Sequence, residues 1–351
     1  MTTLLQTFSL PLLKWYDKHG RKNLPWQHPR SPYQVWISEI MLQQTQVKTV
    51  IPYFTRFMAS FPTIQSLAQA SEDDVLAHWS GLGYYSRGRN LHKTATIIHN
   101  QFNDHFPDDV QQLIKLPGIG PSTAAAITSL AFGQPTAILD GNVKRILSRY
   151  FLISGALTEA SVNNKLWELA EECMPASRCA DYSQAIMDLG ATCCTPKNPH
   201  CVECPLHRTC LAKRANEVAN YPNKKPKKTI PTKQQQFLLL HNDSGFIYLE
   251  KRPPTGIWGG LWCLPSIEIE ACPLRYVRDH YDSSTMKFNE LGTIKHTFSH
   301  FHLMIKARSL HVKNASKNVT EDTGQWVNPT QMPTLGLAKP ISMIIKLHIT
   351  R

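Results

Sequence analysis

From Trp15 to about Leu211 the chain carries apolar residues at the spacing of amphipathic helices. Clear examples are the segments 66–79, 90–101 and 162–173, which are separated by short runs containing Gly or Pro. An apolar residue every three or four positions forms one helix face, which another element must cover. Strand-like alternation is scarce in this region. The pattern predicts an all-α domain.

The pattern changes at 221–236, where three prolines and five lysines replace the apolar periodicity. Such a composition favours an extended, solvated chain, so we predict a linker over 221–234. The basic run KKPKK within it could be a nuclear address or a phosphate contact. A solvated linker is the simpler interpretation.

Beyond the linker, short runs rich in β-branched and aromatic residues alternate with Gly- and Pro-rich breaks. These runs are FLLL (237–240), GFIYLEK (245–251), GLWCL (260–264) and TIKHTFSHFHLMIKA (293–307). A short helix is expected after Pro340. The chain is therefore predicted to be multidomain: a helical domain over 1–220, a linker over 221–234 and an α/β domain over 235–351.

One acidic residue interrupts an apolar helix. In ISEIMLQQTQV, 37–47, Glu39 shares a helix face with Val35, Trp36 and Leu42. Acidic residues of a surface helix normally lie on the opposite face, so we expect Glu39 to be half-buried, with its carboxyl pKa raised toward neutrality. A helix salt bridge is the alternative.

A glycine-rich turn lies between two helical stretches in LIKLPGIGPSTAAAIT, 113–128. Gly118 and Gly120 allow a tight turn, and the helix expected to open at Pro121 would aim free N–H groups at a ligand. Such a hairpin suits one phosphate and reads no base. An ordinary connection between helices looks similar.

The charge makes a phosphate ligand more credible. The 351 residues contain 38 Lys and Arg against 26 Asp and Glu, a formal net charge of +12. This excess favours a polyanion such as nucleic acid, or an acidic membrane face, although a merely basic enzyme is an alternative. No apolar run reaches membrane length, and the N-terminus lacks the basic start of a signal peptide. We expect a soluble cytoplasmic protein, nucleoid-associated if bacterial.

A second carboxylate, Asp140, follows an apolar run in LDGNVKRIL, 139–147. Asn142 is expected to cap the next helix, and Asp140 to stay ionised at that helix N-terminus. A plain turn or capping role for Asp140 is an equal alternative. Paired with Glu39, Asp140 fits cleavage of an N-glycosidic bond through an oxocarbenium-like state.

Such an enzyme must rotate a nucleotide out of the duplex and fill the gap that it leaves. Polar residues after the Glu39 helix and the segment GLGYYSRGRN, 81–90, are candidates for gap filling and backbone contact. They are Gln43, Gln44, Thr45, Tyr84, Arg87 and Arg89. Core packing is the alternative for the two adjacent tyrosines, and it is our preferred interpretation for Tyr85.

Nine cysteines are present, five of them between Cys193 and Cys210. Cys194, Cys201, Cys204 and Cys210 form the pattern C-x6-C-x2-C-x5-C, and four thiolates so close in sequence can surround one metal centre. Ligand type alone leaves zinc and an iron-sulfur cluster open. Cys193 is expected to be a buried neighbour of this set.

The distinctive stretches of the chain are LPW, WISEIMLQQTQV, GLGYYSRGRN, LPGIGPSTAAAI, LDGNVKR, the four-cysteine pattern and FSHFHL. Together they resemble the MutY-type adenine DNA glycosylases of the helix-hairpin-helix superfamily. The resemblance covers essentially the whole chain. It implies a helical catalytic domain with a [4Fe-4S] cluster on the cysteine loop, 194–210, and a Nudix-like domain that recognises 8-oxoguanine. It also implies a monomer, with no membrane partner, that acts on double-stranded DNA containing A:8-oxoguanine or A:G mispairs.

The resemblance also assigns residues. Glu39 is similar to the acid that protonates adenine, and Asp140 to the carboxylate that stabilises the sugar cation. The adenine pocket would comprise Leu24, Trp26, Asn142 and Gln184. 8-Oxoguanine and the DNA around it would be contacted by Gln44, Thr45, Leu82, Tyr84, Phe298, Ser299 and His300. The residue patterns described above add Gln43, Arg87, Gly118, Gly120 and Ser122 as candidate DNA contacts. The cluster ligands would be Cys194, Cys201, Cys204 and Cys210.

Three features depart from related patterns. Ser122 stands where lyase-active relatives carry a nucleophilic lysine, so a monofunctional enzyme is expected. The acidic Nudix hydrolase signature is absent, so the second domain should bind rather than hydrolyse. Gln184 replaces a glutamate of some members. Two competing hypotheses are a lyase acting on oxidised pyrimidines and a non-catalytic iron-sulfur module for DNA binding or redox sensing.

Overall fold

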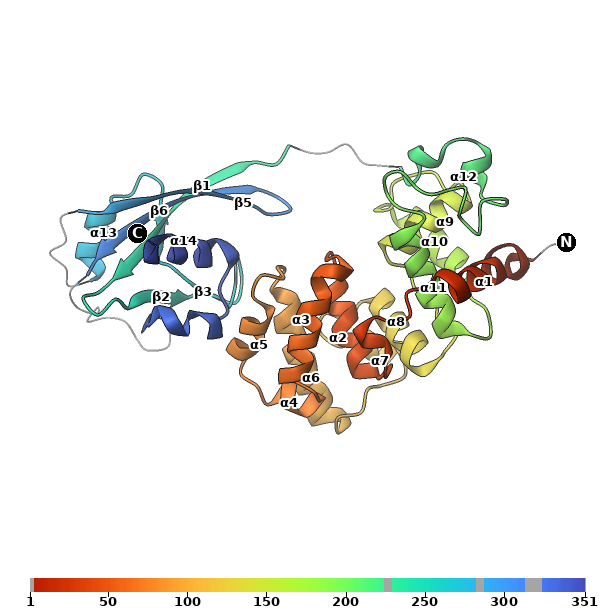
Figure 1. The fold of residues 1–351 in the computed structure, drawn as a ribbon, viewed down its shortest axis with the longest axis horizontal. Helices are drawn as coiled ribbons and strands as arrows, with labels where there is room; N and C mark the ends of the chain where they lie inside the picture. The colour runs from red at the N-terminus through yellow and green to blue at the C-terminus, as the bar shows by residue number, and fades with distance from the viewer. Residues whose placement is uncertain (1–2, 224–228, 282–286, 313–323, 351) are drawn as a thin grey trace. The chain divides into compact units, whose positions relative to one another are not determined.

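The computed structural model describes residues 3–223, 229–281, 287–312 and 324–350. The chain divides into two compact units (Figure 1). The first comprises Met1–Ala68 with Lys93–Lys227, and the second comprises Gln69–His92 with Lys228–Arg351. The KKPKK run of the expected linker lies outside the described residues.

The first unit is helical, as the apolar periodicity predicts. Its elements are a π-helical turn η1 (Leu5–Ser9), α1 (Leu10–His19), a 3-10 turn η2 (Pro25–Gln27), α2 (Pro32–Leu42), α3 (Val47–Ser60), α4 (Ile64–Ala68), α7 (Val110–Ile114), α8 (Pro121–Phe132), α9 (Gly141–Tyr150), α10 (Ala160–Glu172), α11 (Cys179–Thr192), α12 (Leu211–Arg214) and η3 (Val218–Asn220). α6 (Ser86–Phe102) begins in the second unit and continues into the first.

The helix that carries Glu39 lies at the centre of the first unit. α2 is capped by Ser31, whose hydroxyl accepts from the amide of Gln34 at 3.2 Å, and Pro32 opens its first turn. Trp36 and Ile37 are fully buried, and α2 packs against α8 and α3. Because nearly every face of α2 is covered, a polar group on it is desolvated unless it meets a cavity.

The predicted helix 66–79 is in fact two helices, α4 and α5 (Glu72–Trp79). Ser71 caps α5 by accepting from the amide of Asp74 at 3.0 Å, and three acidic residues follow in its first turn. A side chain that takes up amide groups stops the preceding helix and starts a new one. The chain also passes here from the first unit to the second.

The second unit is built on one seven-stranded sheet in its described residues, in the order β3-β2-β1-β6-β5, with β4 on β1 and β7 on β2. The strands are β1 (Thr232–His241), β2 (Ile247–Lys251), β3 (Trp262–Cys263), β4 (Ser266–Glu268), β5 (Asn289–Thr297), β6 (His302–His311) and β7 (Gly324–Val327). The helices are α5, α13 (Pro273–His280), the 3-10 turn η4 (Pro329–Thr334) and α14 (Lys339–Ile349). β1 and β6 pair in parallel, while β5 and β6 form an antiparallel hairpin.

The segment Gln69–His92, which the sequence assigned to the helical domain, packs with the second unit. Leu76 of α5 belongs to the apolar core formed by β1, β2, β6 and α14. Lys251 pairs with Asp73 at 2.8 Å, and the hydroxyl of Ser80 donates to the carbonyl of Leu337 at 2.9 Å. The second unit is therefore discontinuous in sequence.

No helix within the described part of the chain is long and apolar enough to cross a membrane.

Candidate active site

A cavity of about 810 Å³ opens in the first unit where separate segments of the chain meet. Its walls come from the Leu24–Trp26 stretch, the end of α2, and the first turns of α8 and α9, with α11 on another side. Both Glu39 and Asp140 line this cavity. The structure thus brings together the two carboxylates that lie far apart in the sequence.

Glu39 has an unusual electrostatic environment. Its neighbours on α2 are buried, and the part of Glu39 that stays exposed faces the cavity. Burial, and to a smaller extent the negative charge of Asp140, raise the pKa of Glu39 to about 8. The predicted half-burial is confirmed, and both influences favour the protonated form of the Glu39 carboxyl.

Asp140 is the N-cap of α9. Its carboxylate accepts from the amides of Asn142 at 2.9 Å and Val143 at 2.8 Å, and from the side-chain amide of Asn142 at 3.0 Å. The expectation that Asn142 caps this helix is wrong, because α9 already begins at Gly141. The cap is Asp140 itself, so its capping and chemical interpretations coexist.

The pKa of Asp140 is raised, which differs from the expectation of an ordinary ionised group. Burial raises it, while the hydrogen bonds from Val143 and Asn142 and the charge of Arg145 lower it. These N–H donors and the helix N-terminus stabilise the charged form, and they offset part of the desolvation cost.

Arg145 holds the side chain of Asn142 in place through a hydrogen bond. Its guanidinium donates to the side-chain oxygen of Asn142 at 2.9 Å and to the carbonyl of Gly190 at 2.7 Å, and its Nε donates to the carbonyl of Cys194 at 2.8 Å. A hydrogen-bonded path therefore links Asp140 to the cysteine loop.

The residues expected in the adenine pocket line the same cavity. They are Leu24, Trp26, Asn142 and Gln184. Trp26 is held by an edge-on contact with Phe54, with ring centroids 5.3 Å apart. An apolar wall beside a few polar groups is the usual construction of a pocket for a flat heterocycle.

The polar residues after α2 also reach this cavity. Gln43, Gln44 and Thr45 line it, and Gln44 has a positive φ of 56°. The side chain of Gln43 donates to the hydroxyl of Thr123 at 3.4 Å. Ser122 lines the same space, and its hydroxyl accepts from the amide of Leu139 at 3.2 Å.

The glycine-rich turn has the predicted geometry. Gly118 adopts φ +78°, Gly120 is exposed, and α8 begins at Pro121 with Gly120 as its N-cap. A left-handed residue followed by a helix N-terminus presents backbone N–H groups to an anion.

A second cavity, of about 670 Å³, lies in the second unit. Its lining includes Tyr84 together with Phe298, Ser299 and His300 of the turn between β5 and β6. Tyr84 is 48% exposed. Tyr85 packs against the apolar core, and its hydroxyl donates to the carbonyl of Leu337, so the preferred interpretation of Tyr85 as a packing residue is confirmed.

Arg87 does not fit the expectation of a DNA contact. It is buried, and its guanidinium lies 5.5 Å from the ring centroids of both Trp79 and Tyr84. It donates to the carbonyl of Gly83 at 3.0 Å, so it supports the loop that presents Tyr84. Leu82 is buried in the same loop.

Some site residues were missed by the sequence analysis. Arg21, Thr123 and Met187 line the first cavity, and Trp258 and His296 line the second. The only available signal was helical spacing, which places Met187 three residues after Gln184 on α11.

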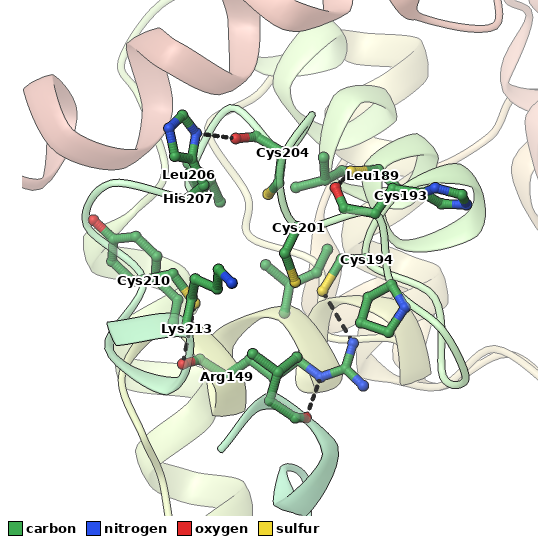
Figure 2. A pocket seen from close by; sticks show the side chains of 15 residues that line it. Arg149, Leu189, Cys193, Cys194, Cys201, Cys204, Leu206, His207, Cys210 and Lys213 are labelled. Atoms are coloured by element: carbon green, nitrogen blue, oxygen red, sulfur yellow. Dashed lines mark hydrogen bonds between the residues drawn. The ribbon is translucent and has the colours of Figure 1, made fainter. Parts of the chain in front are cut away.

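The four cysteines surround one small space (Figure 2). Cys194, Cys201, Cys204 and Cys210 line a cavity of about 30 Å³, and their sulfurs face it. Arg149 donates to the sulfur of Cys194 at 3.3 Å and to the carbonyl of Thr195 at 2.8 Å. Cys193 lines the same cavity, but its thiol donates to the carbonyl of His200 at 3.3 Å.

In the described ranges, no three His, Cys, Asp or Glu side chains converge closely enough to hold a single metal ion. Four cysteine sulfurs around one space have the donor chemistry of a thiolate-bound metal centre, zinc or an iron-sulfur cluster alike, and a guanidinium N–H directed at a sulfur stabilises a thiolate.

Comparisons with known proteins decide the family. Residues 37–172 match the model of the HhH-GPD superfamily base excision DNA repair proteins, and residues 236–347 match the NUDIX domain. An adenine DNA glycosylase of Buchnera aphidicola subsp. Schizaphis graminum is 42% identical over 346 residues, covering 98% of this chain and 99% of that protein. The chain belongs to the adenine DNA glycosylase family.

More distant relatives agree with this assignment. The human adenine DNA glycosylase is 33% identical over 401 residues, covering 96% of this chain and 73% of that protein. A solved thermostable thymine-DNA glycosylase superposes with a TM-score of 0.54 at 27% identity, covering 60% of this chain and 97% of that one. An endonuclease III–DNA complex, at 21% identity and a TM-score of 0.51, shares the fold.

The predicted family and fold class are confirmed: this adenine DNA glycosylase has a helical helix-hairpin-helix domain and a C-terminal Nudix-like domain. It is a base-excision repair enzyme that acts on DNA. The non-catalytic hypothesis is therefore set aside. The roles of individual residues in this adenine DNA glycosylase are proposals.

Proposed function

We propose that this enzyme removes adenine paired with 8-oxoguanine or with guanine in double-stranded DNA, by hydrolysis of the N-glycosidic bond and without a lyase step. The observation that carries the proposal is the pair Glu39 and Asp140 in one cavity, with the pKa of Glu39 raised to about 8. A protonated acid beside a hydrogen-bonded carboxylate suits departure of a protonated base.

Glu39 acts as the general acid. It gives its proton to a ring nitrogen of adenine as the bond to C1′ breaks, so that the base leaves neutral. Asp140 stabilises the positive charge that develops on the sugar, and its orientation is fixed by the three N–H donors at the start of α9. Water then adds to C1′ of the cation and gives a proton to the carboxylate of Glu39, which completes the hydrolysis and restores the acid.

The extruded adenine would lie against Leu24 and Trp26, with Asn142 and Gln184 as its polar neighbours. Gln43, Gln44 and Thr45 stand at the same cavity and would occupy the gap left in the stack. The turn at Gly118 and Gly120 would hold a backbone phosphate.

Ser122 supports the hydrolytic mechanism. A lyase of this fold needs an amine nucleophile that attacks C1′, and a serine hydroxyl that accepts from the Leu139 amide cannot form an imine.

The second cavity is proposed to read the base opposite adenine. 8-Oxoguanine differs from guanine by an N–H at position 7 and a carbonyl at position 8. The hydroxyl of Ser299 can accept the former or donate to the latter, and the imidazole of His300 lies beside it at 3.3 Å. Phe298 and Tyr84 add aromatic surface to the same cavity.

Cys194, Cys201, Cys204 and Cys210 are proposed to hold a [4Fe-4S] cluster. When bound, it supplies structural cross-linking of the loop over 194–210 rather than a step of the hydrolysis. Arg149 and Arg145 then tie this loop to α9, which carries Asp140. We propose that the enzyme acts as a monomer.

The direct test is a single-turnover assay with A:8-oxoguanine and A:G duplexes, followed by heating in alkali to cleave abasic sites. Glu39→Gln should reduce adenine release by at least about a hundredfold, the usual scale for loss of a general acid. Glu168→Gln, on the exposed face of α10, is the matched control and should cleave normally. Undiminished release by Glu39→Gln would refute the acid assignment.

The recognition role has its own test. Ser299→Ala combined with His300→Ala should lower the rate ratio of A:8-oxoguanine to A:G, because two polar partners of the oxidised base are lost. An unchanged ratio would remove the recognition role and leave the hydrolytic mechanism standing.

A further inference from the structure

A buried ion pair lies beside the first cavity and has no part in the mechanism above. Asp188 of α11 is fully buried and accepts three hydrogen bonds from Arg21: from its backbone amide at 2.7 Å, from Nε at 2.9 Å and from Nη2 at 2.7 Å. A buried charge of this kind is costly to form and stabilises little by itself. Its position next to the site therefore needs a reason.

The same carboxylate accepts a fourth hydrogen bond, from the Nε2 of Gln184 at 2.9 Å. Gln184 precedes Asp188 by one helical turn, so both side chains lie on one face of α11. A carboxylate engaged by a guanidinium offers only acceptors, and it can bind the nitrogen but not the oxygen of a neighbouring amide. The Arg21–Asp188 pair thus fixes which end of the Gln184 amide faces Asp188.

The oxygen end of this amide is not engaged by Asp188. Gln184 lines the cavity and is only 4% exposed, and its Oε1 accepts no hydrogen bond from the described residues. A carbonyl oxygen of a cavity-lining residue that has no donor from the protein can take one from a ligand. In adenine, the one strong donor on the base is the amino group at C6.

We propose that Asp188 and Arg21 are positioning residues that make Gln184 a carbonyl acceptor for the C6 amino group of the extruded base, and so select adenine over 6-oxopurines. This rests on the proposed adenine pocket. Hypoxanthine carries an oxygen at C6, which would oppose Oε1 with no proton between them. A site that hydrogen-bonds one group strongly rejects an analogue lacking it, because its own polar atom stays unpaired.

The experiment measures single-turnover release of adenine, purine and hypoxanthine, each opposite guanine in one duplex sequence. Purine has only a hydrogen at C6, so its release rate measures what the rest of the site contributes. Gln184→Met keeps the side-chain length but removes the acceptor, and it should lower the adenine to purine ratio about tenfold. Asp188→Ala frees the amide to turn its Nε2 toward the base, so the hypoxanthine to adenine ratio should rise by a similar factor.

A gain in hypoxanthine release cannot come from a loosened fold, which would slow all three bases together. Asp181→Ala, which removes a half-exposed acid that pairs with Arg178 on the same helix, is the matched control and should keep wild-type ratios. Equal losses for the three bases in both Gln184→Met and Asp188→Ala would overturn the inference. If instead Glu39→Gln releases purine at the wild-type rate, the proposed pocket itself is wrong.

Discussion

The guanidinium of Arg145 donates a hydrogen bond to the carbonyl oxygen of Cys194 at 2.8 Å, and its Nη2 reaches the side chain of Asn142 at 2.9 Å. One buried side chain therefore contacts both the loop of the cysteine cluster and the residue that donates to Asp140. The cluster site and the catalytic carboxylate share a support, although 54 positions separate Asp140 from Cys194 in the sequence numbering (194 minus 140).

Replacing this support should slow the enzyme. In Arg145→Met the acceptors on Asn142, Gly190 and Cys194 lose their donor, and we expect the free energy of unfolding to fall by about 2–4 kcal/mol. Adenine release should fall about ten- to a hundredfold in single-turnover assays below the melting temperature, because the Asn142 side chain that donates to Asp140 is no longer held in place.

Lys144→Met is the control, since it removes a cation from the same helix whose partner is Asn163 rather than the site. A double variant that combines Arg145→Met with Asn142→Ala tests whether Arg145 acts through Asn142 or independently of it. If Arg145 acts through Asn142, the double variant is about as slow as the slower single one, whereas independent losses would multiply.

The raised pKa of Glu39 predicts an alkaline limit to activity. The protonated carboxyl is the active form, so the single-turnover rate should be flat near neutrality and fall about tenfold per pH unit above about 8. A rate that stays constant to pH 9.5 while Asp140 is intact would contradict the assignment of Glu39 as proton donor.

The same group should affect stability with a defined sign. The pKa of Glu39 in the folded protein lies above the ordinary 4.5, so folding favours the protonated carboxyl. The contribution of Glu39 to the free energy of unfolding is fully present below pH 4.5 and is lost as the pH rises to about 8. Thermal melts of the wild type and Glu39→Gln should therefore diverge over this window, with the glutamine variant becoming relatively more stable. Parallel melting curves from pH 5 to 8 would show that the carboxyl is not desolvated.

How much of this site could be predicted depends on whether each feature is encoded by neighbouring residues or by contacts between distant segments of the sequence. The burial of Glu39 was predictable because Glu39 shares a helix face with the apolar residues Val35, Trp36 and Leu42. The turn at Gly118 and the start of α8 were found because backbone conformation is a local property.

Other features depend on contacts between distant segments, and no local pattern encodes them. Arg21 and Asp188 meet across 167 positions, and α5 packs with strands that follow it by more than 150 residues. The burial of Arg87 between two rings was missed for the same reason, since an arginine after two tyrosines reads equally well as a DNA contact.

The cysteine loop can be tested by iron content. Purified protein should contain about four iron atoms per chain and show broad visible absorbance, as expected for four thiolates around one cubane. Cys204→Ser should lose most of the iron and melt at a lower temperature. Cys193→Ser, whose thiol contacts the carbonyl of His200, should retain iron. Stoichiometric zinc in place of iron would refute the cluster.

Trp258 should influence which opposing base is preferred. It is nearly buried at the second cavity with a φ of +53°, and its ring centroid lies 5.8 Å from Phe298 and 5.6 Å from His296. Trp258→Leu should lower the A:8-oxoguanine to A:G rate ratio about two- to tenfold, the range that aromatic pairs supply. Trp326→Leu, which packs on the other core cluster around Tyr248, should leave the ratio unchanged.

Converting Ser122 to lysine should create the chemistry that the wild type lacks. Ser122 lines the cavity with Glu39 and Asp140, so an amine placed there would be close to C1′ of an extruded nucleotide, and desolvation would favour its neutral, nucleophilic form. Borohydride added during turnover should trap a covalent protein–DNA adduct with Ser122→Lys but not with the wild type. Thr123→Lys introduces the same amine at the next position of the cavity and should trap less. A trapped adduct with the wild-type enzyme would contradict the hydrolytic mechanism, because it would require an amine nucleophile that position 122 does not provide.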